Sequence, residues 1–103
     1  MLREIVSALV RHDYRLSGLE SVEPLTADDA DRMSRNIASY GATLIDLPEE
    51  TWDSSQAQWT GSHWDAFVDL WTAEEGRSDL MLSTEVWETK VGYRFEVEMV
   101  FVP

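Results

Sequence analysis

The sequence predicts an α+β fold in which two N-terminal helices pack on one face of an antiparallel meander sheet of four or five strands. Up to residue 40, apolar residues recur at the helical spacing of three and four positions. From residue 42 to the end they recur at alternate positions, and short glycine-containing turns separate the segments. Helices followed by a run of strands are typical of a helix layer segregated to one side of an antiparallel sheet.

We expect a single domain over residues 1–103, because most domains are about 100 to 150 residues long. Hydrophobic residues make up 44% of the chain, which is enough apolar material for a core. The absence of cysteine excludes a disulfide scaffold, a cysteine nucleophile and a thiolate metal site. The charged N-terminal segment is typical neither of a signal peptide nor of a membrane span, so we expect a cytoplasmic protein that does not bind membranes.

The first helix is expected over roughly residues 2–14. One apolar stripe runs along it, formed by Leu2, Ile5, Val6, Leu9 and Val10. The second helix is expected over about residues 27–40. Thr26 precedes it and Asp29 follows three residues later, which is a variant of the capping box. Gly41 stands where a left-handed residue commonly ends a helix.

The alternating segments predict the strands. The expected strands are a short one at 42–47, stopped by Pro48, and then 56–60, 64–72, 79–88 and 93–102, with residues 49–55 as a loop. Their apolar sides predict the core-facing set Ala66, Val68, Leu70, Leu80, Leu82, Val86, Phe95, Val97, Met99 and Phe101, with Thr84 interposed. We expect both helices to pack there.

The opposite face of the sheet, here named the outer face, mixes carboxylates with large aromatic side chains. It is expected to carry Asp65, Phe67, Asp69, Trp71, Met81, Ser83, Glu85, Trp87, Arg94, Glu96, Glu98, Val100 and Val102. A buried face does not hold that many unpaired carboxylates. The predicted partner-binding residues are therefore Asp65, Phe67, Asp69, Trp71, Glu85, Trp87, Glu96 and Glu98. The alternative is structural: cross-strand pairs that stabilise the sheet, with a loop at 48–62 folding over part of the face.

The net charge of −12 resides mainly in residues 41–103, which hold 13 acidic and 3 basic residues. Such a surface repels nucleic acid and attracts basic proteins. We expect a monomer or weak homodimer that binds a basic protein partner, and by analogy an immunity protein or inhibitor of a toxin fits the size and charge. The alternatives are a small-molecule or ion-binding domain, with a pocket between helices and sheet lined by tryptophans, or a charge that serves only solubility.

No motif in the sequence specifies a reaction, so we predict no catalytic residue and no cofactor, and a non-enzymatic role is favoured. His63, Asp65 and Asp69 share one side of a predicted strand, as a set of metal ligands would. The two aspartates, however, lie about 13 Å apart along an extended strand, which is too far for one ion. No metal site is therefore predicted.

An acidic turn follows at residues 74–79. Its charged residues are Glu74, Glu75, Arg77 and Asp79. One guanidinium can bridge two carboxylates, so Arg77 is expected to lock this turn. The alternative is that Arg77 orients the acids toward a cation of the partner.

The segments WDSS, DLWT, EEGRSDL and GYRFE, together with YGATLIDLP, resemble a family of small bacterial proteins known as a domain of unknown function. The resemblance extends more loosely through both N-terminal helices and so covers nearly the whole chain. It implies a one-domain bacterial protein, and it implies no activity, cofactor or catalytic residue.

Overall fold

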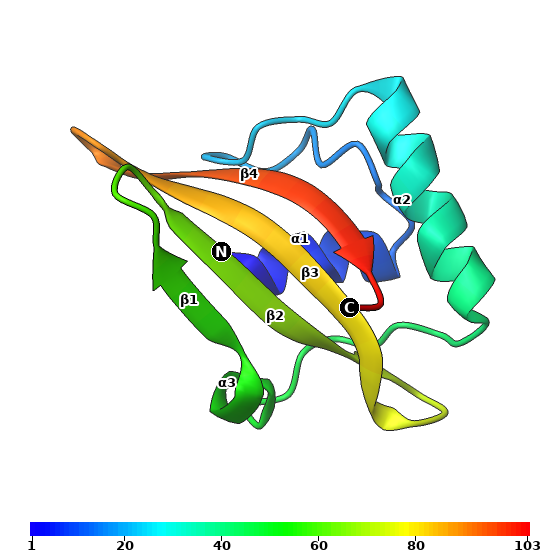
Figure 1. The fold of residues 1–103 in the computed structure, drawn as a ribbon. Coiled ribbons are helices and arrows are strands. Elements are labelled where there is room, and N and C mark those ends of the chain that lie inside the picture. Colours follow the sequence, from blue (N-terminus) through cyan, green and yellow to red (C-terminus); the bar gives the residue numbers. More distant parts are fainter.

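The computed structural model describes residues 1–103 and has an antiparallel sheet of four strands together with helices (Figure 1). This confirms the predicted α+β class. The elements are α1 (Leu2–Val10), α2 (Ala27–Tyr40), α3 (Thr51–Ser54), β1 (Gln56–Trp59), β2 (Trp64–Thr72), β3 (Gly76–Thr89) and β4 (Gly92–Phe101). The strands lie in the order β1-β2-β3-β4, each antiparallel to the next. None of the helices is long and apolar enough to cross a membrane.

Helix α2 has the predicted bounds and both predicted caps. The Thr26 hydroxyl accepts a hydrogen bond from the backbone N–H of Asp29 at 3.2 Å, and Gly41 adopts φ +83°. Helix α1 ends at Val10, earlier than expected, because His12 takes the left-handed conformation at φ +65°. The backbone N–H of Asp13 then reaches back to Ala8 O at 2.9 Å, which satisfies a carbonyl of the last turn.

One hydrophobic core joins both long helices to the sheet. In Figure 1, α1 lies behind the strands and α2 runs past the β4 side of the sheet. The Asn36 side chain fastens α2 to β4 by donating to Val100 O at 3.1 Å. The core cluster contains Ile5, Val6, Ala8, Leu9, Leu16, Val22, Leu25, Ala30, Met33, Ile37, Leu44, Leu47, Val68, Leu70, Leu80, Leu82, Val97 and Val100.

The alternation of β4 is interrupted by a β-bulge. Ser83 of β3 pairs with Met99, but the next residue, Thr84, pairs with Val97, so Glu98 is the extra residue. A bulge sets two residues of one strand against one of its partner and therefore changes which side chains face inward beyond it. Sequence alternation alone does not reveal this position.

The bulge corrects the predicted core. Val100, expected on the outer face, is fully buried, whereas Met99, expected in the core, is 46% exposed. Phe101 and Val86 are only half-buried. Phe95 is also half-buried, and it packs against the core cluster.

The predicted strand at 42–47 is wrong. Only one isolated bridge, between Leu44 and Thr72, links this segment to the sheet. The predicted loop at 49–55 contains the short helix α3, which lies against the edge of β2 next to the start of β1. There the Thr51 hydroxyl donates to Asp69 O at 2.6 Å, and the Asp69 N–H donates to Ser55 Oγ at 3.1 Å. These side chains replace the missing neighbouring strand.

Two exposed tryptophans lie opposite each other at the start of the sheet. Trp59 of β1 pairs with Trp64 of β2, and their ring centroids are 5.3 Å apart. Trp64 is two residues from the buried Ala66, so by strand alternation both rings project on the core side of the sheet. Trp59 therefore does not cover the outer face.

Candidate functional site

The outer face carries a row of carboxylates across three strands. Asp65 of β2 is directly opposite Glu85 of β3, and Glu85 is directly opposite Glu96 of β4. Like charges at directly opposed positions of a sheet are destabilising. The fold therefore brings together acids that are up to 31 positions apart in the sequence, at a cost in stability.

His63, in the connection before β2, sits against this row. Its Nε2 lies 3.0 Å from Asp65 Oδ1 and 3.2 Å from Glu85 Oε2. Its Nδ1 lies 3.0 Å from Ser62 Oγ and 3.3 Å from Thr60 Oγ1. The structure thus brings His63 and Asp65 together with a glutamate of the next strand, and not with Asp69 as the sequence spacing suggested.

Glu98 of β4 lies beside the group formed by His63, Asp65 and Glu85. Burial raises the pKa of Glu98, and the negative charges of Glu85 and Asp65 raise it further, while a hydrogen bond from Ser83 and the nearby His63 act in the opposite direction. Ser83 Oγ lies 3.4 Å from Glu98 Oε1. The acids of the row therefore make it harder to ionise Glu98.

Aromatic and basic side chains complete the outer face. Trp87 stacks on the His63 ring, with centroids 4.4 Å apart and an interplanar angle of 26°. Arg94 pairs with Glu96 at 3.1 Å, and its Cζ lies 5.8 Å from the Trp87 ring. Phe67 is half-buried on the same face, and the rings of Phe67 and Trp87 thus flank the acids.

Two of the predicted partner-binding residues are not part of this group. The Asp69 carboxylate accepts a hydrogen bond from the Ser54 hydroxyl of α3. Trp71 packs against the core cluster, and its indole N–H is buried without a hydrogen-bond partner. A bulge between Asp69 and Trp71 shifts the β2–β3 register here, which sequence alternation does not show.

The acidic turn is held by other contacts than those expected. Arg77 forms no ion pair. Instead, Glu74 accepts hydrogen bonds from the Thr43 N–H at 2.8 Å and the Thr43 hydroxyl at 3.0 Å, and these bonds lower the pKa of Glu74. The Asp79 N–H donates to Tyr40 OH at 3.0 Å. The turn thus anchors the segment that follows α2.

Glu75 completes the turn. Its backbone N–H donates to the Thr72 hydroxyl at 3.1 Å, across the end of the hairpin. The carboxylate of Glu75 is one of the groups that raise the pKa of Tyr40, although the largest single influence on Tyr40, its bond with the Asp79 backbone, acts to lower it. Glu74 and Glu75 therefore lie in the turn, whereas Asp79 lies in β3 and is held through its backbone N–H.

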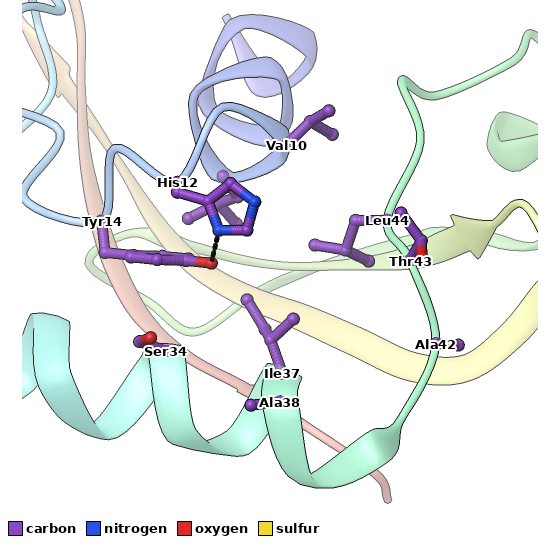
Figure 2. A pocket seen from close by; sticks show the side chains of 10 residues that line it. Val10, His12, Tyr14, Ser34, Ile37, Ala38, Ala42, Thr43 and Leu44 are labelled. Atoms are coloured by element: carbon purple, nitrogen blue, oxygen red, sulfur yellow. Dashed lines mark hydrogen bonds between the residues drawn. The ribbon is translucent and has the colours of Figure 1, made fainter.

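A cavity of about 360 Å³ lies between α1, α2 and the segment after α2 (Figure 2). Figure 2 shows the Tyr14 hydroxyl meeting His12 Nδ1, a contact of 2.8 Å. No tryptophan lines this cavity, so it differs from the tryptophan-lined pocket that was one of the alternatives considered from the sequence. Its lining residues are Leu9, Val10, His12, Tyr14, Ser34, Ile37, Ala38, Ala42, Thr43 and Leu44.

A family model for DUF7668, a domain of unknown function, matches residues 6–103. The chain belongs to this family. The DUF7668 match takes in all four strands, both residues of the His63–Asp65 contact and the facing Glu85. No curated protein and no solved structure matches the chain.

Proposed function

We propose that this DUF7668 protein is a non-enzymatic interaction module of the immunity or inhibitor type, which binds a basic partner protein through the outer face of its sheet. The observation that carries the proposal is the row of Asp65, Glu85 and Glu96 across three adjacent strands, with Glu98 beside it. A cytoplasmic location and a bacterial origin remain predictions from the sequence.

The charge of the row supports a basic partner. Arg94 is the one Lys or Arg side chain in an ion pair with these acids, and it pairs with Glu96 alone. Asp65, Glu85 and Glu98 are left with a single imidazole. Lysine and arginine side chains of a partner would relieve this repulsion, and the field of a protein with charge −12 would speed the encounter.

The aromatic side chains support a contact surface. Phe67 and Trp87 are only half-buried, although both are large and lie in the middle strands of the sheet. Aromatic residues are enriched at the centres of protein interfaces because they bury much area at little entropic cost. The outer face thus combines rings that supply contact area with acids that select the sign of the partner.

Site-specific photo-crosslinking in the native cell tests the proposal. A benzoylphenylalanine replacing Phe67 should capture a basic protein, whereas the same group replacing Trp59, which is exposed on the opposite side, should not. The captured protein, once purified, should bind the DUF7668 chain in the presence of EDTA. This binding should weaken as salt is added.

Charge-neutral variants locate the contact. Glu85→Gln combined with Glu96→Gln should weaken binding of the captured protein at least tenfold, because both carboxylates are lost from the row. The matched control, Asp28→Asn with Asp31→Asn, removes the same charge from α2 and should leave binding nearly unchanged. Equal loss in both double variants, or capture only from position 59, would refute the assignment to the outer face.

The cavity of Figure 2 supports a second candidate, a small-molecule binding domain. Its volume of about 360 Å³ falls within the range of ligand pockets, and it offers the Tyr14 hydroxyl and the His12 ring among apolar walls. A thermal-shift screen of metabolites tests this candidate, since a ligand at 100 times its dissociation constant stabilises by about 2.7 kcal/mol. Shifts that Ala38→Trp abolishes would favour the pocket over the outer face.

A further inference from the structure

We propose that His63, Asp65 and Glu85 form a binding site for a divalent transition-metal cation such as Zn²⁺. The site shares Asp65 and Glu85 with the proposed contact surface, but it needs no partner protein to form and does not rest on the proposed function. His63 comes from the connection before β2 and Asp65 from the start of β2, while Glu85 comes from β3, and the antiparallel pairing holds Asp65 directly opposite Glu85. No single stretch of sequence contains the set.

The donor atoms have the spacing that one ion requires. One donor atom from each of the three residues lies within 4.8 Å of the others. Nε2 of His63 is 3.0 Å from Asp65 Oδ1 and 3.2 Å from Glu85 Oε2. Ligand atoms bound at about 2.1 Å to one metal lie about 3.0 to 3.4 Å apart at octahedral or tetrahedral angles. A cation can therefore be reached from these positions with small side-chain adjustments.

The charge of the group favours a dication over a self-sufficient ion pair. A protonated His63 carries one positive charge, whereas Asp65, Glu85 and the adjacent Glu98 carry three negative charges when ionised. The Arg94 guanidinium, on the same face of the sheet, is engaged by Glu96. A dication beside a neutral imidazole offsets two of these negative charges, whereas a proton on the imidazole offsets one.

The His63 ring is already oriented for metal binding. Ser62 Oγ and Thr60 Oγ1 lie next to Nδ1, which leaves Nε2 directed at the carboxylates. Contacts of this kind on the second ring nitrogen are typical of metal-bound histidines, because they fix the tautomer and the ring plane. The stacked Trp87 ring restrains the imidazole from one side.

The ligand types select the class of metal. One imidazole nitrogen with two carboxylate oxygens suits Zn²⁺, Mn²⁺, Fe²⁺, Co²⁺ or Ni²⁺, whereas Mg²⁺ and Ca²⁺ prefer oxygen ligands alone. The side chains are 15%, 30% and 25% exposed for His63, Asp65 and Glu85, so an ion can enter from solvent and still gain from a partly dry site.

Calorimetric titration of the purified chain with ZnCl₂, and separately with CoCl₂, tests the site. We expect one ion per chain, with Mg²⁺ binding at least tenfold more weakly. Asp65→Asn and Glu85→Gln should each weaken Zn²⁺ binding about tenfold or more, and His63→Gln should abolish it. The control His12→Gln removes the other histidine, which lies beside Tyr14 at the end of α1, and should leave binding unchanged.

Nitrogen-15 NMR of the histidine rings keeps the test independent of variant folding. In the wild-type chain, Zn²⁺ should shift the Nε2 resonance of His63 and leave both His12 nitrogens in place. Binding should weaken as the pH falls, because protons compete for the ligands. No Zn²⁺ binding at millimolar concentration, or a shift confined to His12, would overturn the proposal without bearing on the EDTA-resistant binding of a basic partner.

Discussion

The two ends of the β2–β3 pair differ in whether a buried hydroxyl group finds a hydrogen-bond partner within the chain. At the turn end, the buried Ser78 hydroxyl donates to Leu70 O at 2.7 Å and accepts from the Leu80 N–H at 3.1 Å. At the open end, the Thr84 hydroxyl is buried without a partner, and Asp65 faces Glu85 across the strands. The Ser78 hydroxyl at the turn end is thus satisfied within the chain, whereas at the open end the Thr84 hydroxyl stays without a partner and the facing carboxylates are left for an external cation to neutralise.

This difference separates two sets of acids that look alike in the sequence. Glu74 receives two hydrogen bonds from Thr43, which lower its pKa, so it is most stable as a charged group of the fold. Burial and neighbouring acids raise the pKa of Glu98. Acid content alone therefore does not identify a binding surface; what identifies it is whether the fold supplies donors to the carboxylates.

The largest effect that would sharpen the comparison is expected from Ser78→Ala. The change removes the partner of two backbone groups in a buried place, so it should lower the free energy of unfolding by about 2 to 3 kcal/mol. Urea denaturation measures this. Arg77→Gln, at the neighbouring exposed position without an ion pair, should change stability by less than about 0.5 kcal/mol. If Arg77→Gln lowered the free energy of unfolding more than Ser78→Ala, Arg77 would stabilise the turn as the sequence predicted.

A smaller effect of opposite sign is expected from Thr84→Val. Valine has nearly the same shape and removes a hydroxyl that is buried with no partner, so stability should rise by about 1 kcal/mol. Thr84→Ser keeps the hydroxyl, loses a methyl group and should destabilise. Both are measured by thermal melting. If valine destabilises, the hydroxyl has a partner and the contrast between the two ends is smaller than described.

The smallest effect is expected from Glu98→Gln, and it depends on pH. The raised pKa means that the folded state holds this proton more tightly than the unfolded state does. The wild-type chain therefore loses stability as the pH rises from the ordinary value of 4.5 through the raised pKa. Because Glu98 is largely solvent-exposed, Glu98→Gln should gain only a few tenths of a kcal/mol at pH 7 and nothing at pH 3.

Glu88→Gln is the matched control for this pH dependence. It removes the same charge from β3 three positions beyond Glu85, outside the group around His63. A gain of equal size at pH 7 in Glu88→Gln would show that net charge, and not the contact of Glu98 with Asp65 and Glu85, sets the effect.

Local signals in the sequence predicted much of the fold. The Thr26 cap and Gly41 gave both ends of α2, because capping depends on residues a few positions apart. Gly76 takes φ +74° at the predicted turn. The early end of α1 was missed because His12, and not glycine, adopts the left-handed conformation there.

The candidate site was predicted only in part. Asp65, Glu85, Glu96 and Glu98 were expected on the outer face, but the grouping of His63 with Asp65 and Glu85 was missed. The only sequence signal for this grouping is the antiparallel pairing of the two strands that flank the turn at residues 73–75. The bulge between Asp69 and Trp71 shifts that register, so a count from the turn does not pair Asp65 with Glu85.

The sequence by itself determined the α+β class, the bounds of α2, the hairpin turns and the acidity of residues 41–103, because each depends on local periodicity, capping or composition. Only the tertiary structure decided which acids meet His63, that Val100 rather than Met99 is buried, and that Thr43 rather than Arg77 holds Glu74. The physical reason is that strand register and bulges are set by the packing of the whole sheet, and one shifted position moves a side chain to the other face.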